Sequence, residues 1–463
     1  MYQTQRTTHQ DTADHRMQTQ FDVIVIGAGA AGMMCAAQAG QRGRRVLLID
    51  HAEVLGERIR ISGGGRCNFT NREVSASNFL SQNPDFCRSA LARFSAQDFI
   101  ALVQHHGIAW HEKTLGQLFC DDSAQRIIDL LRNECEDGAV QWAMPCSVQA
   151  VRALPDDTAQ NISHQTARYE LDTSRGRLQC HSLVIASGGL AIPKLGASPF
   201  GYRLAEQFGI PVVPPQPALV PLALAPALLQ ELASLSGLSL TVSACCQIDT
   251  EGQKHKPGNK PGSKNSGKGG GNARRHTPAP QFREQLLLTH RGLSGPAALQ
   301  VSSYWQMQNL YVNNANNTNV TRQPIHFDLL PGIDAEAWLE SEQHSRALPS
   351  TLLSAHWPRR LAQAWCVLYQ FEQPLHQMSA QQRQALAQQL KQWQVMPSGT
   401  LGFAKAEITL GGIDTHALSS RTLEAQSQPG LHFIGEVVDV TGWLGGYNFQ
   451  WAWSSGWAAG QVV

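Results

Sequence analysis

Two short apolar runs flank a segment of small residues near the start of the chain. Residues 21–26 are apolar except for Asp22, residues 27–40 are mostly Gly and Ala, and residues 46–49 are apolar again. Apolar runs of this length that end in glycine are typical of strands buried on both faces of a parallel sheet. The pattern predicts a strand, a closely packed helix and a second strand, and therefore an α/β fold.

The turn between the first strand and the helix carries glycines at a spacing that suits a dinucleotide. Gly27 permits the tight turn, Gly29 lets a pyrophosphate approach the backbone, and Gly32 lets the helix pack closely on the sheet. The first helical residues, Ala30 and Ala31, present unpaired N–H groups to the phosphates. The alternative interpretation is a glycine-rich turn without a ligand.

The second apolar run ends at an acid. Asp50 follows Gly27 by 23 residues, where a carboxylate accepts the hydroxyl groups of an adenosine ribose. A carboxylate there disfavours a ribose 2′-phosphate, because the two groups carry like charges. The glycine turn and Asp50 together predict a Rossmann-like site for a dinucleotide.

A second glycine loop occupies residues 62–71. Its three consecutive glycines, Gly64 among them, permit positive φ and the close approach of a flat ligand, and Arg66 and Asn68 add donors. We predict that this loop, with Arg58 before it, contacts a flavin.

Two residues are candidates for the acid that donates a proton. Cys67 is either a proton donor or redox thiol beside the flavin, or a small buried residue that packs the loop. His290, next to Arg291 in a turn, is the second candidate, because this turn is placed to face a substrate.

The chain between these loops and the next motif alternates between helical and strand periodicity. The predicted elements are helices at residues 76–109 and 121–136, a short hairpin at residues 110–120, and strands of a small sheet at residues 140–151 and 168–178. His105, His106 and His111 lie in this part, and we interpret them as surface or packing residues rather than metal ligands. No metal site is predicted.

A buried strand at residues 182–186 ends in small residues. Ser187, Gly188 and Gly189 form a turn that we expect to return against the cofactor. Near the other end of the chain, Gly435 and Glu436 end another predicted strand, and the Glu436 carboxylate is assigned to the ribityl hydroxyls of FAD.

The C-terminal helix begins after a further glycine turn. Gly446, Tyr447 and Asn448 open it, and its N-terminal N–H groups are expected to face the pyrimidine end of the flavin, where reduction builds negative charge. Without the first motif, the segment would be a core helix preceded by glycine turns.

Composition changes between these two parts of the chain. Prolines after residue 210 mark a crossing, strand-like runs follow, and residues 335–393 are mostly helical and Gln-rich. The predicted organisation is a disordered tail at residues 1–20, an FAD-binding domain at residues 21–208 and 401–463, a β-rich insert at residues 209–333, and a helical part of the insert at residues 334–400.

A basic arm lies within the insert. It begins at Lys254 and ends at Arg275, and it contains seven Lys and Arg residues, six Gly and no acid. A segment of this composition cannot bury a core, so it is predicted to be a flexible loop. Concentrated basic charge indicates contact with nucleic acid; the alternative is a tolerated, solvated insertion.

Whole-chain composition is that of an ordinary globular protein. The 463 residues carry a net charge of +1, and the ten cysteines include no C-x-x-C pair. This scatter excludes a zinc ribbon and a disulfide framework, and it suits the reducing cytosol. The polar N-terminus lacks the apolar region of a signal peptide, and no membrane span is predicted.

These motifs together resemble the BaiN/RdsA-type family of NAD(P)/FAD-dependent oxidoreductases. The shared segments are residues 27–32, 61–71, 186–193 with Gly196 and Gly201, 289–300, 406–412 and 435–450. The resemblance implies a glutathione-reductase-type FAD-binding domain interrupted by a β-barrel-like and helical insert. It also implies tightly bound FAD, with NADPH or NADH as a transient electron donor, consistent with the lack of a second G-x-G-x-x-G. The basic arm departs from the family pattern.

The family leaves several activities open. Some members resemble enoyl reductases of bile-acid metabolism or aminoacetone oxidases, and one branch reduces a uridine of large-subunit ribosomal RNA to dihydrouridine. The basic arm favours the last, with ribosomal RNA as the partner of a cytoplasmic enzyme. The alternatives are a reductase or oxidase of a small enone or amine, and a flavin-containing RNA-binding factor without turnover.

Overall fold

Five parallel strands form the centre of the first domain. The computed structural model describes residues 19–155, 167–247, 279–314 and 322–463, so the basic arm and nearly all of the predicted N-terminal tail lie outside the described residues. The strand order is β7-β2-β1-β10-β20. The strands are β1 (Gln20–Ile26), β2 (Val46–Ile49), β7 (Gln141–Ala143), β10 (Gly176–Ile185) and β20 (Leu431–Phe433).

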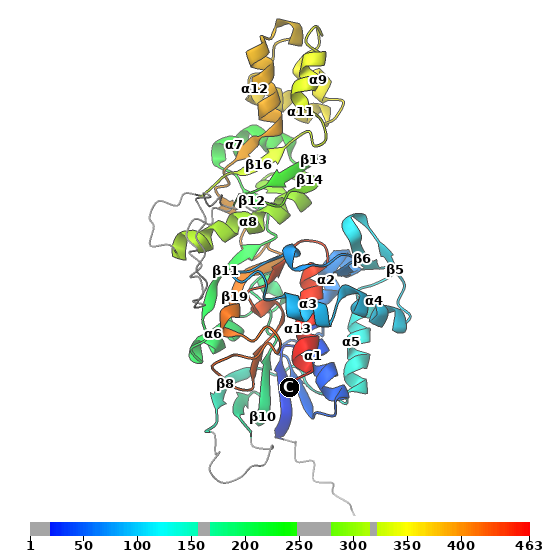
Figure 1. Cartoon of the computed structure of the whole chain (residues 1–463), viewed down its shortest axis with the longest axis vertical. Helices are drawn as coiled ribbons and strands as arrows, with labels where there is room; N and C mark the ends of the chain where they lie inside the picture. Colours follow the sequence, from blue (N-terminus) through cyan, green and yellow to red (C-terminus); the bar gives the residue numbers. More distant parts are fainter. Residues whose placement is uncertain (1–18, 156–166, 248–278, 315–321) are drawn as a thin grey trace, which may run out of the picture.

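Helices α1 (Ala30–Gln41) and α13 (Tyr447–Gly460) join the two ends of the chain. They lie side by side against the sheet (Figure 1), and glycines make the contact close. A Cβ added at Gly456 would lie 2.4 Å from the backbone oxygen of Ala31, and one added at Gly460 would lie 2.6 Å from the Cβ of Gln38. The helix at the C-terminal end of the chain therefore packs directly against the first helix.

The first sheet continues beyond its parallel centre, which corrects one prediction. Strands β8 (Val148–Ala153) and β9 (Tyr169–Thr173) pair antiparallel with each other, and β9 pairs with β10. The prediction of a separate small sheet is wrong, as is a single strand over residues 168–178, because a turn at Ser174 and Arg175 divides that segment. Both flanking segments alternate, so periodicity alone did not reveal the turn.

The prediction of one helix over residues 76–109 is also wrong. This segment contains β4 (Phe79–Leu80), α3 (Arg88–Arg93) and α4 (Ala96–His105). The first helix ends at Arg93, and Ser95 caps the second. The Ser95 hydroxyl accepts from the Asp98 N–H, while the Asp98 carboxylate accepts from the Ser95 N–H.

The next two predicted elements are confirmed. The hairpin consists of β5 (Trp110–Glu112) and β6 (Gln117–Cys120), and the following helix is α5 (Gln125–Asp137). His106 and His111 each pair with a carboxylate, those of Glu134 and Asp121. Within the described residues no group of three potential ligands surrounds a metal position.

A pair of strands carries the chain from the first domain to the insert. β11 (Val212–Ala218) and β19 (Ile408–Ile413) are antiparallel, and their register shifts between Val213 and Gln216. Pro214 and Pro215 occupy this shift, where no ladder N–H is needed. The prolines that predict a crossing therefore form part of the strand that makes it.

The insert is a second sheet capped by helices. Its seven antiparallel strands follow the order β17-β16-β13-β14-β15-β12-β18. They are β12 (Leu222–Ala223), β13 (Ser239–Cys245), β14 (Phe282–Thr289), β15 (Gly292–Ser294), β16 (Ile325–Asp328), β17 (Trp393–Val395) and β18 (Gly399–Thr400).

Helix α8 (Gly295–Asn314) lies between this sheet and the first domain, and the helical part forms the far end of the elongated molecule (Figure 1). The other insert helices are α7 (Pro226–Leu232), α9 (Ala335–Ser341), α10 (Pro349–Leu353), α11 (Arg359–Leu368) and α12 (Ala380–Lys391). Among the described residues, every helix is too short or too polar to span a bilayer.

Candidate dinucleotide-binding and active site

Of the three glycines in the turn after β1, two are packed against backbone atoms and one faces open space. A Cβ at Gly27 (φ +112°) would lie 2.3 Å from the Ala186 oxygen, and one at Gly32 would lie 1.8 Å from the Gly27 oxygen. At Gly29 a Cβ would meet no atom within 4 Å. The backbone at Gly29 is therefore uncovered, and the N–H groups of Ala30 and Ala31 at the start of α1 lie beside it.

Asp50 is fixed beside this turn by two backbone donors. Its Oδ2 accepts from the Ala28 N–H at 2.6 Å, and its Oδ1 accepts from the Ala52 N–H at 2.8 Å. The carboxylate is thus attached to the turn itself, and each oxygen keeps a lone pair for a ribose hydroxyl.

The second glycine loop also leaves backbone uncovered by side chains. Residues of α2 (Glu57–Ile61) lead into it, and Gly64 and Gly65 have φ values of +68° and +86°. Neither position has a protein atom within 4 Å of an added Cβ, and the same is true of Gly188 after β10. Arg66 is exposed at the loop. Backbone without side chains on this side suits a flat ring system.

Asn68 links this loop to the start of α13. With its amide oriented to satisfy both ends, it donates to the carbonyls of Leu118 and Thr70 and accepts from the Gly446 N–H at 3.2 Å. Gly446 (φ +92°) leaves no room for a side chain, because a Cβ would lie 2.4 Å from the Thr70 carbonyl. The two predicted cofactor segments are therefore in direct contact.

Arg58 and Glu436 form an ion pair across the site. Arg58 Nη1 lies 2.9 Å from Glu436 Oε2, Arg58 Nη2 donates to the Ala191 carbonyl, and Glu436 Oε1 accepts from the Thr409 N–H at 3.1 Å. Both partners were predicted separately as cofactor-binding residues. Gly189 is needed here, since a Cβ would lie 2.4 Å from Glu436 Oε1.

Two buried hydroxyls beside this pair lack protein partners. Ser187 Oγ and Tyr202 Oη make no hydrogen bond within the described residues. Burial, reinforced by the charge of Glu436, raises the pKa of Tyr202. Unsatisfied buried hydroxyls are uncommon, and a polar ligand or water at this place would satisfy them.

The predicted residues at the start of α13 have different roles. Asn448 Oδ1 accepts from the Gly442 N–H at 2.7 Å, and its Nδ2 donates to the carbonyls of Gly442 and Trp443. Its amide therefore shapes the turn, and its N–H groups are already engaged. The Tyr447 ring is buried edge-on against Phe79.

The two candidate acids lie in contrasting surroundings. Cys67 is fully buried, and burial raises the pKa of its thiol. A side chain without exposed surface cannot touch a substrate that arrives from solvent, which favours the packing interpretation. His290 is exposed in the turn between β14 and β15. Its role as a proton donor stays a prediction.

Thr409 and Gln450 were missed from the sequence. Thr409 Oγ1 accepts from the N–H groups of Leu190 and Ala191, at 2.8 and 3.2 Å. Gln450 Oε1 accepts from Thr70 Oγ1 at 2.7 Å, and its Nε2 donates to the Phe94 carbonyl. Both hold loops around the site, and the available signal was the position of each beside a predicted glycine turn.

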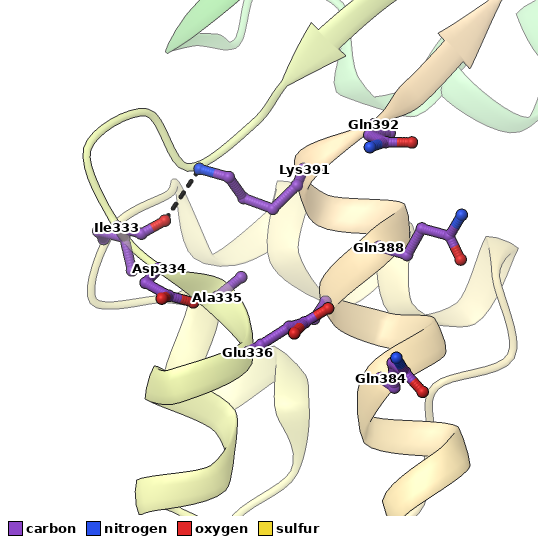
Figure 2. A pocket seen from close by; sticks show the side chains of 9 residues that line it. Ile333, Asp334, Ala335, Glu336, Gln384, Gln388, Lys391 and Gln392 are labelled. Atoms are coloured by element: carbon purple, nitrogen blue, oxygen red, sulfur yellow. Dashed lines mark hydrogen bonds between the residues drawn. The ribbon is translucent and has the colours of Figure 1, made fainter.

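A hollow of about 520 Å³ in the insert lies apart from this site, between α9 and α12 (Figure 2). Lys391 Nζ donates there to Asp328 Oδ2, Leu330 O and Ile333 O, so its charge is already engaged. The remaining lining includes exposed glutamines of α12. None of the predicted cofactor residues borders this hollow.

Comparisons with known proteins agree over nearly the whole chain. The sequence model of the family described as "HI0933-like protein Rossmann domain" matches residues 21–462. A ribosomal RNA dihydrouridine synthase of Escherichia coli is 48% identical over 446 residues, 96% of this chain and 98% of that protein. One of Haemophilus influenzae is 40% identical over 445 residues, 94% and 96%. A 3-dehydro-bile acid delta(4,6)-reductase of Clostridium scindens is 25% identical over 449 residues, 95% and 98%.

Proposed function

The chain belongs to the HI0933-like Rossmann family, which confirms the resemblance drawn from its motifs, and from this membership we propose that it is an FAD-dependent oxidoreductase. Its proposed reaction is the reduction of a uridine of large-subunit ribosomal RNA to dihydrouridine. The similarity to the Escherichia coli synthase, which extends over almost the full length of both proteins, carries this proposal.

The residues of the site suit FAD. Gly29 and the start of α1 would hold the pyrophosphate, and Asp50 would hold the adenosine ribose. The open faces of Gly64 and Gly188 would lie against the flat part of the cofactor, and the unpartnered hydroxyl of Ser187 would gain a partner. When bound, reduced FAD supplies a hydride.

The protein would position the uracil base and supply the proton that the reaction consumes. Reduction of the uracil C5=C6 bond adds a hydride at C6 and a proton at C5, so an acid must face C5. The target base must leave its stack to reach the site. NADPH or NADH is the proposed transient donor of the electrons, because the chain contains one G-x-G-x-x-G only.

Ribosomal RNA would contact basic groups around the site. Lys194 and Lys405 are exposed on two loops that the Ile192 N–H joins to the Phe403 carbonyl at 2.9 Å. The ammonium groups of these two lysines would pair with phosphates of the RNA backbone. The basic arm that begins at Lys254 is the second proposed contact, and the cytoplasm, where ribosomal RNA is folded, is the proposed location.

Mapping of dihydrouridine in ribosomal RNA tests the proposal. A deletion strain should lose one modified uridine of the large subunit, and the wild-type gene should restore it. A gene lacking codons 254–275 tests the arm: RNA turnover should weaken while flavin reduction by NADPH is retained. An unchanged dihydrouridine map in the deletion strain would refute the RNA substrate.

A second candidate is the reduction of a small conjugated enone. The Clostridium scindens relative, named as a bile acid reductase, favours it. Reoxidation of the NADPH-reduced protein by an enone, without any response to RNA, would support this candidate over the first.

A further inference from the structure

Glu407 occupies the point where the insert meets the dinucleotide-binding domain. Its N–H donates to the Leu219 carbonyl at 3.2 Å, and the Leu219 N–H donates to Ser303 of α8 at 3.1 Å. Glu407 directly precedes β19, the strand that connects the two domains.

The alternation of this strand directs Glu407 towards the cofactor residues. Residues two apart in a strand share a face and lie about 7 Å apart. Thr409 is two residues further on, and its hydroxyl and N–H contact the turn after Gly189 and the Glu436 carboxylate. The Glu407 side chain therefore lies on the face of β19 that borders the proposed flavin site.

Its surroundings combine access with desolvation. Glu407 is exposed to solvent, while nearby protein atoms raise the pKa of its carboxyl by desolvation. In the described part of the chain no hydrogen bond or ion pair engages its carboxyl, so the group is free to meet a ligand.

Glu284 provides an internal comparison. Burial also raises the pKa of this β14 carboxyl, but Gln300 donates to it at 3.2 Å. The Gln300 side chain is itself bound to the Leu444 N–H and carbonyl, so Glu284 belongs to a contact between the domains. Of these two glutamates, only Glu407 is both exposed and without a hydrogen-bond partner for its carboxyl among the described residues.

We propose, on the basis of the proposed function, that Glu407 is the catalytic acid that protonates C5 of the target uracil. Bound reduced FAD would supply the hydride to C6 and both electrons. At C5, the Glu407 O–H bond breaks and a C5–H bond forms. The carboxylate that remains takes a proton from solvent before the next turnover. The exposed position allows this exchange, which the buried thiol of Cys67 does not.

The test uses the full-length, flavin-loaded protein and an RNA fragment that the wild type modifies. In Glu407→Gln, the single-turnover rate of dihydrouridine formation should fall by about 100-fold or more. Flavin content and the rate of flavin reduction by NADPH should stay within about twofold. Glu407→Asp keeps an acid and should recover part of the rate. Glu206→Gln, at an exposed glutamate of α6 (Phe200–Gln207), is the matched control and should behave as wild type.

The pH profile separates a proton donor from a structural residue. A proton donor must be protonated before it reacts, so the wild-type rate should fall as the pH rises through the pKa of Glu407. The rate of Glu407→Gln should lack this fall, which is the alkaline limb of the pH profile. A Gln variant with the wild-type rate and limb would overturn the proposal, as would equal losses in the Asp and Gln variants together with lost flavin. Failure of the proposed function is distinct: the wild type itself would then leave the RNA unchanged.

Discussion

The two domains achieve close packing in opposite ways. In the dinucleotide-binding domain, α1 and α13 meet through Gly456 and Gly460, where a single added carbon would collide with the facing helix. In the insert, large rings fill the interior: Trp357 packs edge-on against Trp365 at 5.5 Å, and Trp365 contacts Tyr369 at 4.9 Å. The first domain therefore has little tolerance for added volume at this helix contact, whereas the insert fills the space between its helices with large side chains.

The largest expected effect is the difference in stability between substitution of a glycine packed against protein, Gly32, and substitution of a glycine that faces open space, Gly29. Gly32→Ala places a carbon 1.8 Å from the Gly27 oxygen and should cost more than about 4 kcal/mol of unfolding free energy. Gly29→Ala meets no atom, so its apoprotein should keep wild-type stability while its affinity for FAD falls by about tenfold or more, since the side chain enters the pyrophosphate space. Urea unfolding and FAD titration measure the two quantities. Equal stability of the two apoproteins would contradict the assigned packing.

The next largest effect concerns the buried carboxyl of Asp439 in the first domain. Burial raises the pKa of this carboxyl from 3.8 to about 6. The hydrogen bond that the Gln82 N–H donates to Oδ2 lowers the pKa, but by less than burial raises it. The other oxygen, Oδ1, has no partner in the described residues. The folded state therefore binds this proton more tightly than the unfolded chain, and stability falls as pH rises from about 4 to about 6, by about 3 kcal/mol in total.

Asp439→Asn removes this titration. Its unfolding free energy, measured in urea at a series of pH values, should lack the fall seen in the wild type over that interval. Parallel curves for the two proteins would show that the carboxyl does not titrate in this range.

A smaller effect is expected where the two domains touch. Gln300 of α8 receives the Leu444 N–H at 2.9 Å, and Gln300→Ala should cost about 2 kcal/mol because the donor and acceptor of Leu444 lose their partner. Gln388→Ala, on the exposed face of α12 beside the hollow in Figure 2, should change stability by less than about 0.5 kcal/mol. Thermal unfolding measures the loss of stability in both variants. Equal losses would show that the contact between the domains does not contribute to the effect of Gln300→Ala.

An effect smaller than that of Gln300→Ala should be confined to the insert. Lys391→Met removes the bonds to Asp328, Leu330 and Ile333 and should cost about 1 kcal/mol. Flavin affinity and flavin reduction should be unchanged, because these residues lie in the helical part, away from the first domain. A loss of flavin in this variant would show that the two domains are more tightly coupled than the structure indicates.

Sequence reasoning succeeded where the signal was local. The β1–α1–β2 unit, the strand before Ser187 and the start of α13 each combine an apolar run with a glycine turn, so their pattern is complete within a few residues. It failed at residues 76–109 and 168–178, where a capping serine and a two-residue turn interrupt continuous periodicity.

The site was predictable as a set of loops but not as a set of contacts. The residues of the Arg58–Glu436 pair are far apart in the sequence. The side-chain amide of Asn448 uses its hydrogen-bonding groups within its own turn, which only the geometry of that turn reveals. Glu407 lies in the shared segment at residues 406–412, but the sequence alone predicted no chemical role for it. Its position became visible only when β19 placed it between the two domains.

The most direct test of the central claim is the flavin content of the purified full-length protein. The two ends of the chain, joined through α1 and α13, are proposed to enclose one FAD. After denaturation, absorbance and chromatography of the released cofactor should give about one FAD per chain. A folded protein that carries no flavin and takes up none from solution would contradict the account.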